Sequence, residues 1–216
     1  MTQPIQTFDV KGGPEAGRRA LPLIRAAMDT LGVDGFVIPH EDEYNNEYLP
    51  AANERLAFAT GFTGSAGAAL VMKDKAVLFI DGRYTLQAPA QVDGDLFEFV
   101  SMPDPGLPGW IEAHAPAGAK IGFDPKLHSP AAVARIQNAC DRAGASLVAL
   151  DRNPVDLAWT DRPAAPSAPV VPHPEVYAGE AHGGKRARVG RSLLKAGADA
   201  AVITSTAAHT GHGSVS

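Results

Sequence analysis

An arginine placed directly after an apolar run is the residue of this sequence that is best suited to chemistry. Residues 78–88 read LFIDGRYTLQA, so three apolar positions lead straight into Asp81, Gly82 and Arg83. An arginine held at a rigid strand end presents a fixed fork of N–H donors to a carboxylate or a carbonyl. A second interpretation stays open at this point, in which Gly82 makes a turn and Arg83 pairs with a surface carboxylate. Both interpretations place Arg83 at the end of a strand.

The glycine-rich run GFTGSAG, residues 61–67, matches neither a phosphate loop nor a nucleophile motif. It precedes an apolar strand, whereas a phosphate-binding loop lies between a strand and a helix N-terminus. Ser65 does not complete a G-x-S-x-G motif, because residue 63 is threonine. No nucleophile–base pair is found elsewhere, so a small hydrolase in its own right is not favoured. The run therefore predicts a tight turn with close backbone packing.

Two other segments could attract a metal ion. His209 and His212 are three residues apart, and residues 40–48 read HEDEYNNEY. A metal site needs three or four ligands on an ordered scaffold, which neither segment offers. We therefore expect a polar tail around the two histidines and a solvated loop at 40–48. We expect this chain to contribute no metal ligand and no catalytic residue.

Composition excludes several classes of protein. A net charge of −5 over 216 residues argues against nucleic acid as a partner, because phosphate binding needs a basic face. The single cysteine, Cys140, cannot form an intrachain disulfide, which fits a reducing compartment. It lies in a helical pattern and should be a small core residue. No apolar run approaches the ~18 residues of a membrane span, and the N-terminus lacks a signal peptide. We expect a cytoplasmic protein without a membrane partner.

The pattern of apolar residues predicts an α/β fold with a mixed sheet flanked by helices. Helical spacing appears at 18–31, 84–91, 107–114 and 129–143. Strands are expected at 34–39, 67–73, 76–81, 97–102, 120–125 and 146–151. Only Asp74 and Lys75 separate the second and third of these strands, which indicates a hairpin.

Proline density divides the chain. Residues 161–184 carry five prolines between positions 163 and 174 and predict an extended linker between a domain at 1–160 and a unit at 185–216. Residues 185–204 repeat the pattern of the N-terminal segment: a basic start, an amphipathic helix, a glycine, and then a short strand, AAVI. Gly32 and Asp34 correspond to Gly197 and Asp199. This predicts an incomplete second α/β unit with an irregular tail.

Three segments together resemble the N-terminal region of the three-domain aminopeptidase P family, the Xaa-Pro aminopeptidases. These segments are EYNNEYLPAANERLAFATGFTGSAGAALV, LFIDGRYTLQA and NPVDLAWTDRP, and the similarity runs from about residue 17 to about residue 205. The resemblance implies a creatinase-like, non-catalytic N-terminal α/β domain that shapes access to an active site and takes part in assembly. It also implies that Arg83, the arginine of the family's DGRY segment, contacts the substrate.

The same resemblance implies what this chain should lack. Family members bind two metal ions, often manganese, in a C-terminal pita-bread domain, and they remove an N-terminal residue that precedes proline. The sequence after Thr206 departs from the family pattern, so we expect the catalytic domain, its two Mn ions and its ligands to be absent here. The expected partners are then a peptide with proline at its second position, met only with a catalytic domain, and further copies in a homo-oligomer. The alternative is a stand-alone interaction module that pairs with an intact peptidase or with itself.

Overall fold

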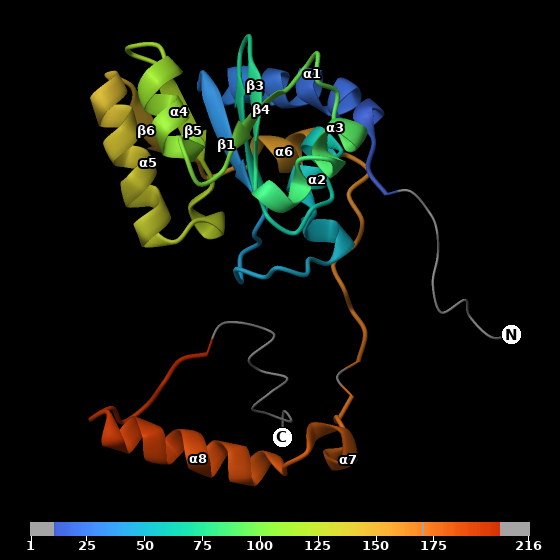
Figure 1. Ribbon diagram of the computed structural model, residues 1–216, viewed down its shortest axis with the longest axis vertical. Coiled ribbons are helices and arrows are strands. Elements are labelled where there is room, and N and C mark those ends of the chain that lie inside the picture. Colours follow the sequence, from blue (N-terminus) through green and yellow to red (C-terminus); the bar gives the residue numbers. More distant parts are fainter. Residues whose placement is uncertain (1–10, 170, 204–216) are drawn as a thin grey trace, which may run out of the picture.

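The computed structural model describes residues 11–169 and 171–203 and contains the predicted mixed sheet (Figure 1). Six strands lie in the order β4-β3-β2-β1-β5-β6. Each strand was expected from the sequence, and the strands are β1 Gly35–Pro39, β2 Gly67–Met72, β3 Ala76–Ile80, β4 Glu98–Ser101, β5 Lys120–Phe123 and β6 Ser146–Ala149. The α/β class with a mixed, helix-flanked sheet is confirmed.

The hairpin β2–β3 gives the sheet its mixed character. Strand β2 pairs antiparallel with both β1 and β3, as the short link at Asp74 and Lys75 predicts. The remaining pairs, β3–β4, β1–β5 and β5–β6, are parallel. Five strands therefore run in one direction and only β2 runs against them. The five parallel strands all end at the same edge of the sheet, and β2 begins there.

Helices cover both faces of this sheet. The helices are α1 Pro14–Leu31, α2 Arg55–Thr60, α3 Gln87–Gln91, α4 Gly106–His114, α5 Pro130–Ala143, α6 Pro154–Ala158, α7 Glu175–Ala178 and α8 His182–Lys195. In β1, Phe36 and Ile38 pack with α1, α2 and α6, whereas Val37 packs with α4 and α5. Successive strand residues point to opposite faces, so a sheet that is buried on both sides needs continuous apolar strands. This is why β1 to β3 read as unbroken apolar runs.

Helix α1 begins earlier than expected. The prediction started this helix at residue 18, but it begins at Pro14, and Pro22 lies in its interior. Proline at the first helical position has a suitable φ and loses no hydrogen bond, which explains the earlier start. Its C-terminus follows the prediction: Gly32 adopts a left-handed φ of 70°, and its N–H donates to the carbonyl oxygen of Asp29.

One predicted element is not formed. The strand expected at 200–203 is irregular in the structure. A strand is stable only when neighbouring strands accept and donate its backbone hydrogen bonds, and no strand of the described chain lies beside it. Helices α2, α6 and α7 were not predicted, because four to six residues are too few to show a helical period.

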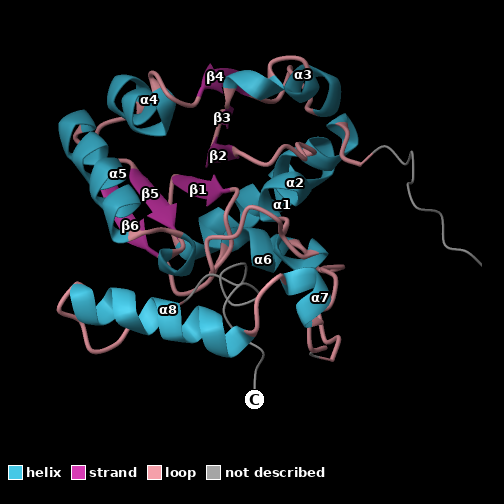
Figure 2. Cartoon of the chain, turned by 60° about the horizontal axis from the view of Figure 1, so that its bottom comes forward, coloured by secondary structure: helices cyan, strands magenta, loops and turns pink. Residues whose placement is uncertain are grey.

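The segment after residue 163 is separate from the sheet. Figures 1 and 2 show an extended stretch that leads to α7 and α8, which lie beyond the packed layers. None of the fourteen residues of α8 is buried. Among residues 11–169 and 171–203, no helix combines the length and the apolar character that crossing a membrane requires.

Candidate substrate-contact site

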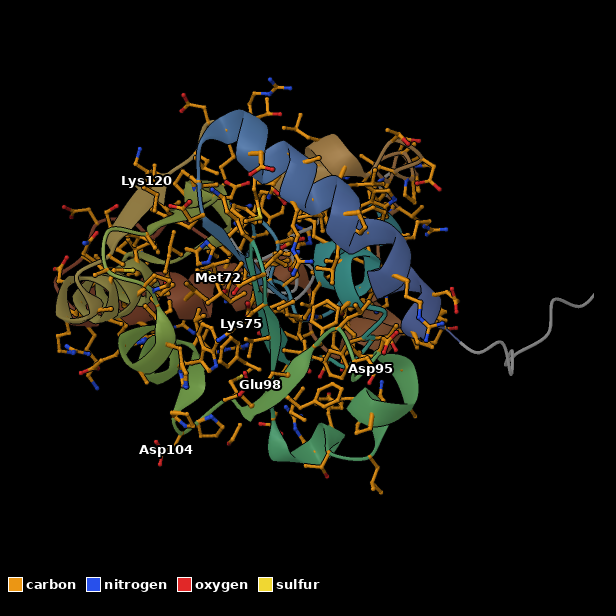
Figure 3. The ribbon with its side chains drawn as sticks, turned by 90° about the horizontal axis from the view of Figure 1, so that it is seen from above. Met72, Lys75, Asp95, Glu98, Asp104 and Lys120 are labelled. Atoms are coloured by element: carbon orange, nitrogen blue, oxygen red, sulfur yellow. The ribbon has the colours of Figure 1, made fainter. Side chains whose placement is uncertain are left out.

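The sequence features singled out above meet at one edge of the sheet. The loop 40–50 follows β1, the turn 61–66 precedes β2, and Arg83 follows β3. Because β1 and β3 end where β2 begins, these segments share the lower edge of the sheet in Figure 1. Figure 3 looks at the molecule from above, onto the opposite edge of the sheet, where Met72 and Lys75 of the hairpin and Lys120 at the start of β5 are labelled. In parallel sheets, ligands bind at the carboxyl ends of the strands.

Asp81 holds Arg83 at the end of β3. Residues Gly82–Tyr84 form a single 3-10 turn, and the Asp81 carboxylate accepts hydrogen bonds from the backbone N–H of Arg83 at 3.0 Å and from its Nε at 2.8 Å. These bonds hold the pKa of Asp81 below its ordinary value. The Arg83 side chain is 62% exposed, so its remaining donors face solvent. The arrangement includes both features considered from the sequence: a carboxylate partner and a guanidinium held at a strand end.

Tyr84 joins this turn to the glycine-rich turn. Its hydroxyl oxygen accepts a hydrogen bond from the backbone N–H of Ser65 at 2.9 Å and lies 2.8 Å from Ser65 Oγ. The Tyr84 ring meets Phe62 edge-to-face, with centroids 5.3 Å apart, and the Arg83 guanidinium lies 5.3 Å from the Tyr84 centroid. Ser65 thus positions Tyr84, and the Ser65 hydroxyl is engaged with the Tyr84 hydroxyl rather than with a base.

The turn at residues 61–67 is held by close backbone packing, as predicted. Gly61 has a φ of 87°, and a Cβ there would lie 2.2 Å from the carbonyl oxygen of Gly13. A Cβ on Gly64 would lie 2.2 Å from the Phe62 ring. Only glycine fits either place, because real Cβ atoms do not approach other atoms so closely. Gln91 closes the turn from outside by accepting from the N–H of Thr63 at 3.0 Å.

The acidic loop 40–50 is organised around one buried carboxylate. Asp42 is 2% exposed and accepts hydrogen bonds from the backbone N–H groups of Tyr44 and Asn46 and from the side chains of Asn46 and Asn53, at 3.0–3.1 Å. Burial raises the pKa of Asp42, but these hydrogen bonds outweigh it and hold the pKa below the ordinary value. The expectation of a solvated loop is therefore wrong for Asp42, although its neighbours are exposed.

A buried arginine ties this loop to helix α6. Arg55 is 4% exposed; its Nη2 lies 2.9 Å from Glu43, and its Nε lies 2.8 Å from Asp156. Burial lowers the pKa of Arg55, but the hydrogen bond and charge of Asp156, with those of Glu43, outweigh burial and raise it. The available signal was an arginine directly before the apolar residues of the segment RLAF, but it does not identify the partners of Arg55.

Arg162 extends the same network into the start of the predicted linker. Its Nη1 lies 2.9 Å from Asp156, and its Nε donates to the carbonyl oxygen of Ala52 at 2.6 Å. Its guanidinium also lies 5.9 Å from the centroid of Trp159. Residues up to Arg162 are therefore held against the first domain, and the extended stretch begins after them.

The remaining candidates lie elsewhere. Cys140 is fully buried in α5, and burial raises the pKa of its thiol to about 11, so it is a core residue as predicted. His209 and His212 lie outside the described residues. Within residues 11–169 and 171–203, no three His, Cys, Asp or Glu side chains come together as metal ligands. The described part of the chain therefore does not fit the two-metal centre implied by the family resemblance.

Known proteins share this architecture and sequence. Probable Xaa-Pro aminopeptidases P of Aspergillus niger and Neurospora crassa are 38% and 37% identical over 164 and 188 residues, which are 74% and 85% of this chain. The chain spans only 26% and 28% of those relatives.

Solved structures agree with these sequence relatives. The X-prolyl aminopeptidase of Caenorhabditis elegans, described as a cytosolic enzyme with a di-nuclear active site, superposes with a TM-score of 0.76. It is 28% identical, and the match covers 87% of this chain and 32% of that one. The N-terminal domain of a cytoplasmic peptidase of Mycobacterium tuberculosis gives a TM-score of 0.50 and 26% identity over 65% of this chain and 97% of its own.

A match to the Creatinase/Prolidase N-terminal domain covers residues 21–155, which include the whole sheet, the loop 40–50 and Arg83. The predicted resemblance is thereby confirmed at the level of the family. This chain belongs to the Creatinase/Prolidase N-terminal domain family.

Proposed function

We propose that this chain is the non-catalytic N-terminal domain of a metal-dependent Xaa-Pro aminopeptidase, and that Arg83 contacts the peptide substrate. The observation that carries the proposal is the position of Arg83: its turn is fixed by Asp81 and by the Tyr84–Ser65 contact, while its guanidinium remains 62% exposed. A fixed and accessible fork of donors is suited to a peptide carbonyl or carboxylate.

The domain would guide the peptide, and the cleavage step would belong to another part of such an enzyme. Hydrolysis of this type uses metal-activated water, and the described residues bring no three metal ligands together. The substrate class proposed is a peptide with proline at its second position, in line with the names of the sequence relatives. The two metal ions, often manganese in the family, would be bound outside the domain described here.

We also place the protein in the cytosol, as is said of the Caenorhabditis elegans enzyme.

Assembly is the second part of this proposal. A sheet edge that contacts a substrate must lie close to a catalytic centre, so this edge would face either the catalytic part of the same enzyme or that of a second copy. The alternative from another class is an interaction module that pairs with an intact peptidase or with itself and has no effect on substrate.

A chimeric enzyme separates these functions. Residues 1–163 of this chain replace the matching region of the Caenorhabditis elegans enzyme, with the junction in the extended stretch after Arg162. We expect the chimera to cleave Xaa-Pro peptides, whereas the same enzyme without any N-terminal domain should lose most of its kcat/KM. Equal activity with and without residues 1–163 would contradict a role in substrate access. The interaction module would then be the function that remains. Mass photometry of both proteins reports assembly independently of activity.

A further inference from the structure

A small groove with an apolar floor lies at the same edge of the sheet as Arg83. It lies between the loop 40–50 and the turn 61–66, and its volume is about 280 Å³. Leu49, Ala57 and Phe62 contribute apolar surface. Small-molecule sites usually enclose roughly 300–1,000 Å³, so this groove suits one side chain better than a whole cofactor.

The rim of the groove is negatively charged. Glu47 and Glu54 line it, and its lining includes no lysine or arginine. The Glu54 side chain is half-buried and has no hydrogen-bond or ion-pair partner among the described residues. Three other carboxylates at this edge are engaged: Asp42 by amides, Glu43 by Arg55 and Asp81 by Arg83.

The groove is also rigidly built. The His40 ring contacts the carbonyl oxygen of Glu47 at 3.0 Å, which fixes one wall. The Tyr84 hydroxyl holds Ser65, which fixes the opposite wall, and Arg83 lies beside Tyr84. The charge of Glu47 is close enough to contribute to the raised pKa of Arg83, after the larger effect of Asp81. The groove and Arg83 therefore belong to one surface.

An apolar floor below a carboxylate rim fits a long cationic side chain. Lysine and arginine lay their methylene stems on apolar surface and keep their charged heads at a polar rim. We propose that this groove binds a lysine or arginine side chain of the peptide that Arg83 contacts, with Glu54 and Glu47 receiving its charge. Peptides with such a residue would be favoured over neutral peptides of the same length. This inference rests on the proposed function for the identity of the peptide, but not for the binding itself.

The experiment uses the 216-residue chain and probes without any Xaa-Pro bond. Acetyl-arginine amide, acetyl-lysine amide and acetyl-citrulline amide are titrated into the ¹⁵N-labelled chain. Citrulline keeps the shape of arginine without its charge. We expect saturable shifts at Ala57, Thr63 and Gly64 with the two cationic probes and about fivefold weaker binding of citrulline, because charge-assisted hydrogen bonds are the stronger ones.

Matched variants test the carboxylates. Glu54→Gln should weaken binding of the arginine probe by about threefold or more, whereas Glu41→Gln, in the loop 40–50 but outside the groove, should change it by less than about 1.5-fold. Equal binding of citrulline, shifts centred elsewhere, or an unchanged affinity in Glu54→Gln would each overturn the proposal. A melting curve shows that Glu54→Gln is folded. The binding result does not depend on hydrolysis. If Arg83→Ala left kcat/KM of the chimeric enzyme unchanged while the arginine probe still bound the groove, only the proposed function would be rejected.

Discussion

Two segments of this chain begin alike and end differently. A glycine with positive φ follows both helices: Gly32, at 70°, comes directly after α1, and Gly197, at 72°, comes two residues after the end of α8. The hydrogen bonds agree as well: Gly32 donates to Asp29 and Val33 to Met28, while Gly197 donates to Leu194 and Ala198 to Leu193. After Gly32 the chain enters the buried strand β1, but after Gly197 it remains irregular.

The difference shows which structure is local and which depends on neighbours. Helix formation and a glycine stop need only the segment itself, so both copies of the pattern form them. A strand needs partners in a sheet, and β1 has β2 and β5. The apolar face of α1 is covered, with Ile24 and Met28 fully buried, whereas Leu194 of α8 is 75% exposed.

The largest expected effect contrasts a core residue with its exposed counterpart. Phe36 lies fully buried in β1, so Phe36→Ala should lower the free energy of unfolding by about 3–5 kcal/mol. Leu194→Ala removes an apolar side chain of α8 that packs against little, and it should change stability by less than about 0.5 kcal/mol. Urea unfolding followed by circular dichroism measures both. Similar losses would mean that α8 belongs to the packed core.

Arg55 tests how firmly the loop 40–50 is attached. Arg55→Met keeps the length of the buried stem but leaves Glu43 and Asp156 without this partner. Because both carboxylates retain some contact with water, and Asp156 retains Arg162, we expect a loss of about 2–3 kcal/mol, below that of a fully buried pair. The same unfolding assay applies. An unchanged free energy of unfolding would show that the apolar packing of the methionine compensates for the lost ion pairs of Arg55.

Asp42 should make stability depend on pH. Its pKa in the folded chain lies below the unfolded value of about 3.9, so its contribution is complete above pH 4 to 5 and is lost as pH falls through the folded pKa. Asp42→Asn should cost about 1–2 kcal/mol at pH 7, because an amide turns a donor toward Asn46 or Asn53.

The pH series also contains its own control. The difference in the free energy of unfolding between wild type and Asp42→Asn should shrink as the pH falls from 5 to 3, because protonation of Asp42 removes the same charge that the substitution removes. Asp74→Asn, in the exposed hairpin, should follow the wild-type curve at every pH. A constant difference for Asp42→Asn over this range would contradict the lowered pKa as its source.

Two truncations locate the end of the first domain. A chain that ends at Pro163 keeps Arg162 and should melt at the wild-type temperature. A chain that ends at Asp161 loses the contacts of Arg162 with Asp156 and Ala52, which should cost about 1 kcal/mol and lower the melting temperature by about 2–4 °C. Limited proteolysis of the whole chain should cut first after residue 163. Equal melting of the two truncations would place the boundary before Arg162.

Much of this fold is visible in the sequence because its sheet is buried on both faces. Apolar runs such as AVLFI at 76–80 and the hairpin at Asp74 can be read locally, and so can the glycine-dependent turn at 61–67. The contacts that build the site edge join distant residues, as in Arg55 with Asp156, and no local pattern announces them. The accessibility of Arg83 likewise depends on what the neighbouring loops leave uncovered. The residue type of Arg83 therefore suggested contact with a substrate, but the exposure of its side chain could be seen only in the structure.

Arg83 provides the most direct test of the proposed site. In the isolated chain, Arg83→Ala should change stability by less than about 0.5 kcal/mol, because the side chain is exposed and its turn is also held through Tyr84. In the chimeric enzyme, the same substitution should lower kcat/KM for an Xaa-Pro peptide by about tenfold to a hundredfold, the worth of one charge-assisted hydrogen bond. Arg83→Lys should recover part of this loss. An unchanged kcat/KM in Arg83→Ala, with the melting temperature of the isolated chain also unchanged, would contradict a substrate contact at this residue.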